Sequence, residues 1–299
     1  MKIALLTRLP NYYTEKRLAE EATNRGHSLD MVRYPACYVA ITEKGTEMLY
    51  KGEKLDAYDA VISRSFAGST SYGTAILRQL EVMGFYTINR SLAITRSVDT
   101  LRTLQILSRE GVPIPKTIFV REPDQADQLI EYIGLPAVIR VASSSKSDTV
   151  VAENRRAISA MIQAFYVKDS TFLIQEYINN PESKSVRVIV VGSSVVASVR
   201  KSKRDTDDTA SISSGKYDKI AILSDSAKKT AVKAARAVGL SMCSVDMIVT
   251  GDDAVVIGVD PYFGIENIEK VTGRNVAEKI IEYVELNAKR RNKKDRVGA

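Results

Sequence analysis

Residues 2–34 read KIALLTRLPNYYTEKRLAEEATNRGHSLDMVRY, and this stretch decides the class of fold. Residues 2–7 form a short apolar run typical of a buried strand, and residues 15–26 carry apolar side chains at helical spacing before a terminal glycine. Residues 28–34 then return to a strand-like pattern. A strand, a helix and a second strand in this order favour two parallel strands joined by a crossover helix. We therefore predict an α/β fold.

The same alternation continues to about residue 95. A second apolar run at 59–64 precedes a helical pattern at 72–84, and a short extended stretch follows at 85–90. These patterns predict a parallel sheet covered by helices, in a first domain over residues 1–95.

A long helix and a proline-rich hinge are predicted next. Helical spacing runs without interruption over residues 91–111, and Pro113 and Pro115 then lead into a strand. Helix and strand patterns alternate again beyond the prolines. We therefore predict a hinge followed by a central α+β lobe over residues 96–181.

Antiparallel pairing is predicted in the last third of the chain. Strand patterns flank the turn sequences GSS and GDD, so residues 185–202 and 247–260 each indicate a hairpin. An alanine-rich helical pattern at 226–239 lies between them, and a last helical pattern follows the second hairpin. We predict a C-terminal α+β lobe over residues 182–288 and a basic tail over 289–299.

Length, apolar content and cysteine usage limit the class of protein. The chain has 299 residues, 44% of them apolar, which suffices for two or three domains of ~100 to 150 residues. No apolar stretch approaches the length of a membrane helix, and no cleavable signal precedes the first strand, so the expected compartment is the cytosol. Cys37 and Cys243 share no metal-binding or redox spacing, and we expect both in the core.

Most of the formal charge of +7 lies in the tail. Residues 289–296, KRRNKKDR, carry six basic residues and one acidic residue. Such a run can contact nucleic acid or the ribosome through phosphates. A solvated helix end whose cations complement the helix dipole is the alternative. No aromatic side chains accompany the run to stack on bases, which argues against nucleic-acid binding as the main function.

Five motifs carry a resemblance to a known family. They are DTLRTLQILSREGVPIP (99–115), LIQEYI (173–178), VRVIVVG (186–192), SVDMIV (244–249) and GIENIEKVTG (264–273). In this order they resemble the ATP-grasp ligases, most closely the RimK type, which add glutamate to the C-terminus of a small-subunit ribosomal protein. The resemblance implies the ATP-grasp fold, in which a Rossmann-like pre-ATP-grasp domain precedes two α+β lobes that enclose a nucleotide cleft. It also implies ATP and Mg²⁺ as cofactors and a protein C-terminal tail as acceptor.

The family's reaction needs carboxylates for Mg²⁺ and cations near the phosphates, because phosphoryl transfer from ATP activates a carboxylate before an amine attacks it. By resemblance, Asp246 stands at a metal carboxylate and Asp260 at a metal-binding Asn. Arg64 stands at an Arg that faces the acceptor, with a surface salt bridge as the alternative. The segment that receives adenine, for which a plain β-strand is the alternative, comprises Gln175, Glu176, Tyr177 and Ile178.

Other positions differ from the family in ways that alter the site's chemistry. Thr100 replaces a phosphate-contacting Lys, and Arg140 replaces a second Lys but keeps its charge. Ser185 replaces an acidic residue that binds the ribose. Thr209 and Ser211 fall where the family has a substrate-side Arg and Asn.

The loop that covers the phosphates in the family has no glycine here. It reads SSSKSD at 143–148, and without glycine the backbone cannot freely take positive φ or approach a phosphate closely. Lys146 and the serines offer donors in its place. The run RKSKR at 200–204 is a second source of cations, with a solvated strand as the alternative.

Gly258, within VVIGVDPYFG at 255–264, is the change with the largest expected effect. The family has a Glu at this position that is expected to bridge two metal ions, and glycine has no side chain to offer. Asp260 in place of a neutral Asn restores some negative charge. We therefore expect weakened metal binding, with at most one Mg²⁺.

Two functions follow from this pattern. In the first, a RimK-like scaffold with little or no ligase turnover is retained for binding, as a homo-oligomer or as partner of an active homologue, a ribosomal protein or another protein tail. In the second, the chain is an active ATP- and Mg²⁺-dependent carboxylate–amine (glutamate) ligase that uses Asp246 and Asp260 for the metal. Its substitute cations for the phosphates would be Arg140, Lys146, Lys203 or Arg204. Because several features of one site have changed together, we favour the first.

Overall fold

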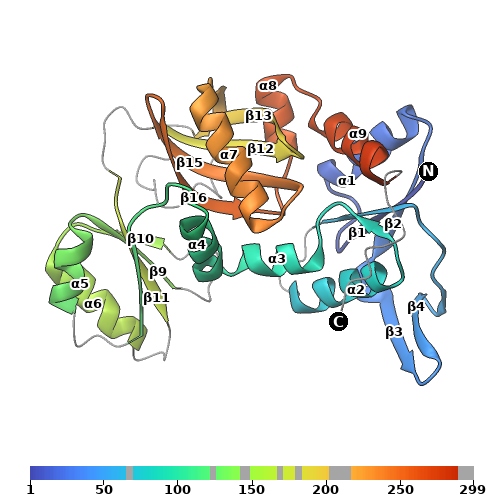
Figure 1. Ribbon diagram of the computed structural model, residues 1–299, viewed down its shortest axis with the longest axis horizontal. Coiled ribbons are helices and arrows are strands. Elements are labelled where there is room, and N and C mark those ends of the chain that lie inside the picture. The colour runs from blue at the N-terminus through green and yellow to red at the C-terminus, as the bar shows by residue number, and fades with distance from the viewer. Residues whose placement is uncertain are drawn as a thin grey trace.

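Four β-sheets, with helices packed on the larger three, make up the part of the chain that the computed structural model describes (Figure 1). The described residues are 1–64, 70–121, 126–141, 149–166, 171–178, 184–201 and 217–288.

The first domain contains the predicted parallel sheet. Its strands are β1 (Lys2–Thr7), β2 (Ser28–Arg33), β6 (Ala60–Ser63) and β7 (Tyr86–Thr87), in the order β2-β1-β6-β7. All three neighbouring pairs run parallel, so the strand–helix–strand prediction is confirmed. The helices of this domain are α1 (Tyr13–Asn24) and α2 (Thr70–Val82).

A second sheet in this domain was not predicted. After a short 3₁₀ helix, η1 (Tyr34–Ala36), the strands β3 (Cys37–Thr42), β4 (Gly45–Tyr50) and β5 (Glu53–Lys54) pair antiparallel and project from the body (Figure 1). Most of their side chains are exposed or half-buried, so the sequence shows no alternation of apolar and polar residues.

The helix predicted without interruption over residues 91–111 is in fact two helices. α3 (Ser91–Val98) and α4 (Thr100–Arg109) meet at Asp99, whose backbone is extended with ψ 105°. The Asp99 carboxylate accepts a hydrogen bond from the Arg102 amide at 3.0 Å. An Asp in this position caps the start of a new helix, which explains why the continuous-helix prediction was wrong.

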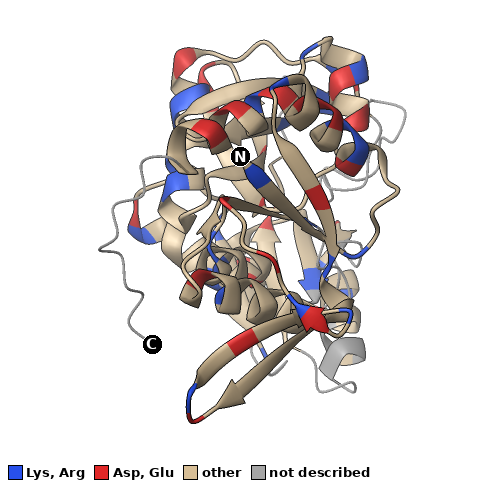
Figure 2. Cartoon of the chain, turned by 90° about the vertical axis from the view of Figure 1, so that its right-hand side faces the viewer, with Lys and Arg blue, Asp and Glu red and all other residues tan. Residues whose placement is uncertain are grey.

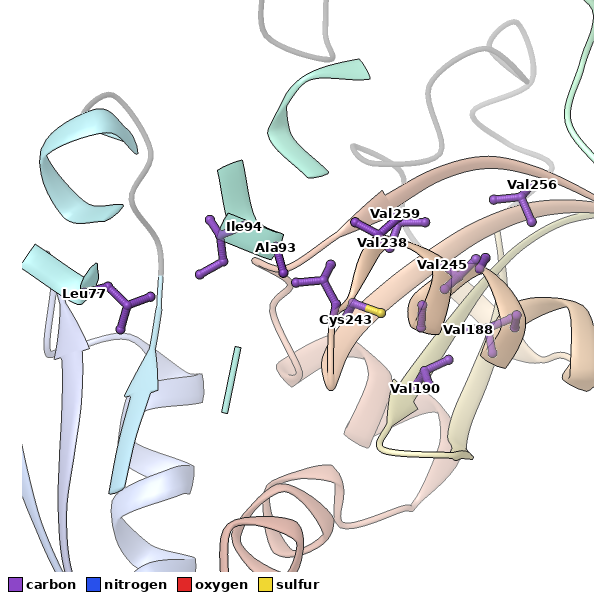
Figure 3. Close-up of a cluster of buried hydrophobic side chains, with 14 of the residues drawn as sticks. Leu77, Ala93, Ile94, Val188, Val190, Val238, Cys243, Val245, Val256 and Val259 are labelled. Carbon is purple, nitrogen blue, oxygen red and sulfur yellow. The ribbon is translucent and has the colours of Figure 1, made fainter. Parts of the chain in front are cut away.

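Helix α3 lies between the first domain and the C-terminal lobe. Ala93 and Ile94 lie between Leu77 of α2 and the side chains of Val238 and Val259 (Figure 3). All of them belong to one hydrophobic core that also includes residues of the parallel sheet. Apolar burial therefore joins the first domain to the C-terminal lobe.

The central lobe has a hydrophobic core of its own. Its four strands pair antiparallel in the order β10-β9-β11-β8, and its helices α5 and α6 pack on this sheet (Figure 1). Buried side chains such as Phe172 and Ile174 form a cluster separate from the rest of the molecule. The elements are β8 (Thr117–Val120), α5 (Ala126–Ile133), β9 (Ala137–Val141), β10 (Thr149–Ala152), α6 (Arg155–Tyr166) and β11 (Phe172–Glu176).

The C-terminal lobe is built on a five-stranded antiparallel sheet, in the order β14-β13-β12-β15-β16. Val191 pairs with Ser194 and Thr250 with Asp253, so both predicted hairpins are confirmed, with tight glycine turns. The elements are β12 (Lys184–Val191), β13 (Ser194–Lys201), β14 (Tyr217–Ile220), α7 (Asp225–Val238), β15 (Met242–Thr250), β16 (Asp253–Asp260), α8 (Glu266–Thr272) and α9 (Val276–Ala288).

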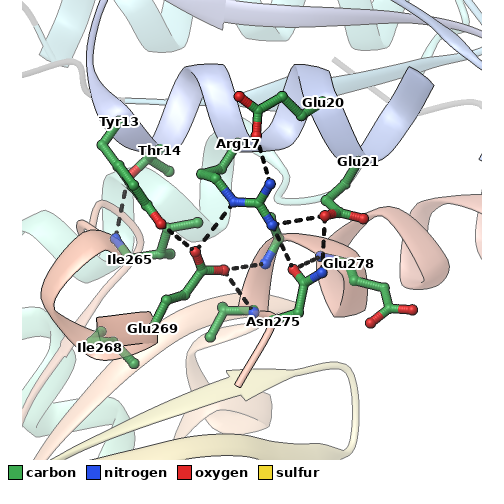
Figure 4. A network of polar contacts seen from close by, with 12 residues as sticks. Tyr13, Thr14, Arg17, Glu20, Glu21, Ile265, Ile268, Glu269, Asn275 and Glu278 are labelled. Atoms are coloured by element: carbon green, nitrogen blue, oxygen red, sulfur yellow. Dashed lines mark hydrogen bonds and ion pairs between the residues drawn. The ribbon is translucent and has the colours of Figure 1, made fainter. Parts of the chain in front are cut away.

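Helices α8 and α9 dock on α1 of the first domain through a polar network (Figure 4). Arg17 donates to Glu21 at 2.7 Å, and Asn275 donates to the same carboxylate at 2.9 Å. Glu269 accepts hydrogen bonds from the Tyr13 hydroxyl at 3.0 Å and from the Val276 amide at 2.8 Å. These hydrogen bonds therefore hold the first and last helices of the described chain together.

Acid should weaken this contact at its far end. The hydrogen bond from Arg25 lowers the pKa of Glu285 to about 2, with a smaller contribution from His27. Because the unperturbed carboxyl titrates near 4.5, the stabilisation is complete above that pH and is lost as the pH falls toward 2. We expect urea denaturation to show the midpoint falling across this window, and Glu285→Gln to flatten the fall. If the urea midpoint falls equally with pH in the parent protein and in Glu285→Gln, the ionised Glu285 does not provide this stabilisation.

Both cysteines are fully buried, as predicted, and both are free thiols. Burial raises the pKa of the Cys37 thiol to about 12, which disfavours the reactive thiolate at neutral pH. In the described part of the chain, no helix has the length and apolar character that crossing a membrane requires.

Candidate nucleotide-binding site

A pocket of about 280 Å³, including the solvent at its mouth, lies between the central lobe and the C-terminal lobe. The C-terminal lobe contributes Ile248 of β15 and Ile257 of β16, and the central lobe contributes the other wall. Five of the seven residues predicted to bind ATP line this one pocket. They are Arg140, Gln175, Glu176, Tyr177 and Ile178.

Hydrogen bonds fix the central-lobe wall. The Gln175 amide donates to the Thr117 hydroxyl at 2.8 Å, and the Glu176 carboxylate accepts from the Lys116 amide at 2.9 Å. The chain leaves the sheet at Tyr177 and Ile178, where the backbone is no longer paired within a ladder. The Tyr177 amide still donates to the Pro136 carbonyl at 3.3 Å, and the apolar side chains that line the pocket suit the stacking surface of a planar heterocyclic base.

Among the described residues that line this pocket, Arg140 is the one cation. It lies on β9, and its Nε is buried and makes no hydrogen bond within the described residues. Burial lowers the pKa of its guanidinium. A buried cationic donor without a partner is costly, and an anionic group on a ligand would offset that cost.

Asp246 is held by an arginine that sequence reasoning left unassigned. Arg187 Nε lies 2.7 Å from Asp246 Oδ1, and Arg187 Nη2 lies 2.8 Å from Oδ2. The two residues are paired across β12 and β15, and only 6% and 5% of their surfaces are exposed. Burial acts to lower the pKa of Arg187, but the Asp246 carboxylate more than offsets this and raises it. Both carboxylate oxygens of Asp246 are therefore engaged by a cation within the protein.

Gly258 lies directly across the sheet from Asp246. A β-bulge follows: Met247 pairs with Val256, so Ile257 has no partner on β15. A Cβ atom at Gly258 would meet nothing within 4 Å, and the backbone there is not in the left-handed region. Neither packing nor backbone geometry therefore requires glycine at this position.

Two further residues that were predicted for the site, Asp260 and Arg64, do not line the pocket. Asp260 pairs with Ser244 at the end of β16, and its Oδ1 accepts a hydrogen bond from the Tyr262 amide at 2.9 Å. Arg64, at the end of β6, is only 6% exposed, and its Nε lies 3.7 Å from Glu15 Oε1. The surface salt bridge considered for Arg64 is therefore wrong, because this arginine is buried against Phe263 of the C-terminal half.

Comparison with known proteins identifies the family. The RimK-like ATP-grasp domain model matches residues 97–284, and the RimK pre-ATP-grasp domain model matches residues 1–94. The chain belongs to the RimK-like ATP-grasp family. It is 40% identical over 298 residues to a probable alpha-L-glutamate ligase 2 of Pseudoalteromonas atlantica, with 99% of each chain covered. It is also 40% identical to a probable alpha-L-glutamate ligase of Halorhodospira halophila, over 97% of this chain and 96% of the relative.

Solved structures confirm the ATP-grasp fold. A RimK domain protein from Sphaerobacter thermophilus superposes with a TM-score of 0.74 at 19% identity, over 95% of this chain and 99% of the other. The ATP-grasp ligase PsnB, in a complex with a precursor variant, Mg and ADP, gives a TM-score of 0.75 at 17% identity, over 95% of this chain and 97% of the other.

The residues of this RimK-like site do not fit a pair of magnesium ions. Asp246 is occupied by Arg187, and Gly258 supplies no ligand. Among the described residues, no group of three or more His, Cys, Asp and Glu side chains is placed to hold a metal. Mg²⁺ requires near-octahedral oxygen coordination, and Asp260 alone supplies a small part of it.

The remaining predicted residues lie elsewhere. Ser185 on β12 and Thr100 at the start of α4 are described, but neither lines the pocket. The structure does not describe the loop at 143–148 with Lys146, the stretch that holds Lys203, Arg204, Thr209 and Ser211, or the tail at 289–299.

The charge distribution on the described surface is mixed. On the face that Figure 2 shows, Lys and Arg are interspersed with Asp and Glu. Some of these charges pair within one helix, such as Lys270 with Glu266 in α8 and Lys279 with Glu282 in α9.

Proposed function

We propose that the protein is a nucleotide-binding member of the RimK-like family with little or no ligase turnover, and that it acts as a binding or partner subunit. One observation carries the proposal. The cleft keeps an apolar pocket with a half-buried cation, Arg140, whose Nε is buried, while Asp246 is engaged by Arg187 and Gly258 offers no carboxylate.

Loss of turnover follows from the chemistry of phosphoryl transfer. Metal ions bridge the phosphate oxygens and neutralise the charge that develops during transfer. Removing a single group that stabilises such charge costs about 10² to 10³ in rate in comparable sites. A site that lacks the bridging carboxylate and has its second carboxylate paired internally is expected to fall well below ordinary ligase rates.

The proposed partner is a peptide or protein tail. Structures with the same fold include PsnB bound to its minimal precursor and to a precursor peptide. By analogy, the acceptor side of this cleft would receive the C-terminal tail of a ribosomal protein or of another protein, near the buried Arg64. Assembly with identical subunits or with an active homologue belongs to the same proposal.

The similarity to probable glutamate ligases favours a second function. In it, the chain is an active ATP- and Mg²⁺-dependent glutamate ligase, with Arg140 at the phosphates and Asp260 at a metal ion. Both functions share nucleotide binding and differ in turnover.

An ADP-release assay separates the two functions. Purified protein is incubated with Mg²⁺-ATP, glutamate and a peptide acceptor that ends in glutamate, and nucleotide binding is followed by thermal shift. We expect ATP to raise the melting temperature and no ADP release above a protein-free control. Release at about 1 s⁻¹ or faster, abolished by Asp260→Ala, would establish the second function instead.

A further inference from the structure

We infer that Arg187 takes the place of the metal ions as the positive charge that meets the phosphates. The cleft therefore binds the di- or triphosphate of a nucleotide without Mg²⁺. This inference rests on the proposed nucleotide binding and specifies the form of the ligand. The family implies a pair of metal ions, and the described residues of this cleft do not fit one.

Arg187 has donors that its ion pair with Asp246 does not use. A guanidinium has five N–H donors, and Arg187 uses one on Nε and one on Nη2 for Asp246. Its Nη1 makes no hydrogen bond to any residue that the structure describes, and the group lies 5.6 Å from the centre of the Tyr217 ring. Arg187 therefore stays charged and keeps donors for an anion. Its planar fork matches phosphate oxygens as well as carboxylate oxygens.

The ion pair lies within reach of a nucleotide bound in the pocket. Ile248 lines the pocket, and Asp246 is the next residue on the same face of β15, roughly 7 Å further along the strand. Arg187, on the neighbouring strand β12, lies beside Asp246. A nucleotide whose base occupies the pocket and whose phosphates run along β15 therefore reaches this ion pair. Arg140 flanks the same path from the central lobe.

The charges of this cleft are balanced without a metal ion. Two carboxylates at a phosphate site repel the phosphates unless a metal ion neutralises them. Here Gly258 removes one carboxylate and Arg187 neutralises the other, so the polyphosphate meets no net negative charge from this pair. The missing carboxylate at Gly258 and the pairing of Asp246 with Arg187 therefore belong together, because a metal ion is not needed where the anionic ligands are absent or already paired.

The test is calorimetric titration of the full chain with ADP, in excess MgCl₂ and in EDTA. We expect the same Kd in both buffers. Asp246→Asn releases Arg187 from its carboxylate, so binding in EDTA should be retained or become tighter. The double variant Arg187→Gln/Asp246→Asn removes both charges without leaving a buried charge unpaired, and it should bind at least about tenfold more weakly than Asp246→Asn. Circular dichroism confirms that each variant is folded.

Three results of these titrations would contradict the role of Arg187. Binding in MgCl₂ that disappears in EDTA, or in Asp246→Asn, would show that Asp246 holds a metal ion, and would overturn the inference while nucleotide binding itself stands. Equal affinities of Asp246→Asn and the double variant would show that Arg187 does not contact the phosphates, and would also overturn it. Absence of ADP binding in both buffers would overturn the proposed nucleotide-binding function together with this inference.

Discussion

Replacing Arg187 by Met is expected to lower the free energy of unfolding by about 3–5 kcal/mol. The reason is that Asp246, which is 5% exposed, would be left as a buried carboxylate without its bidentate partner. Burying an uncompensated charge costs far more than the loss of an exposed ion pair. Chemical denaturation, followed by circular dichroism and by tyrosine fluorescence, measures the change.

Two controls isolate the buried charge as the cause. The double variant Arg187→Met/Asp246→Leu replaces the pair by apolar groups and should recover most of the lost stability. Arg109→Met removes an arginine from an exposed pair with Glu110, and it should cost less than about 1 kcal/mol. A loss below about 1 kcal/mol for Arg187→Met itself would show that water or a rearranged side chain compensates Asp246.

Gly258→Glu is expected to make nucleotide binding depend on magnesium. The new side chain would lie across the sheet from Asp246, with the Cβ atoms about 5 Å apart, and the first atom of that side chain has open space. A second carboxylate supplies the bridging oxygens that Mg²⁺ requires and competes with Asp246 for Arg187. We expect ADP to bind the variant about tenfold or more tightly in MgCl₂ than in EDTA.

Gly258→Gln is the matched control for that substitution. Glutamine has nearly the same size but no charge, so its ADP affinity should be equal in the two buffers. If the glutamate variant folds normally and its ADP affinity does not depend on magnesium, Gly258 is not what limits metal binding. The Arg187–Asp246 pair would then be the limiting feature.

Local patterns were sufficient to predict most of the fold. The alternation of apolar strands and amphipathic helices up to residue 95 indicated the parallel sheet, and glycine turns marked the two hairpins. The break at Asp99 was missed because apolar spacing continues on both sides of it, whereas the capping hydrogen bond that starts α4 depends on one side chain. The sheet over residues 37–54 was missed because few of its side chains are buried.

The site was harder to predict, because its chemistry depends on register. Arg187 and Asp246 are 59 residues apart, and only the pairing of β12 with β15 brings them together. A single arginine within the apolar run VRVIVV was the available signal, since a charge in a buried strand needs a partner. The bulge at Ile257, which sets how the residues beyond it face the cleft, leaves no mark in the sequence.

The contact between α1 and α9 has a consequence for synthesis of the protein. Leu18 and Ala22 of α1 share one core with Ile280 and Ile281 of α9, so α1 leaves the ribosome well before the helix that covers its apolar face. Until α9 has been synthesised, this face of the nascent chain stays open to chaperones and to other nascent chains. Translation that stops before α9 would leave that face exposed for good, and such a fragment would be a substrate for degradation.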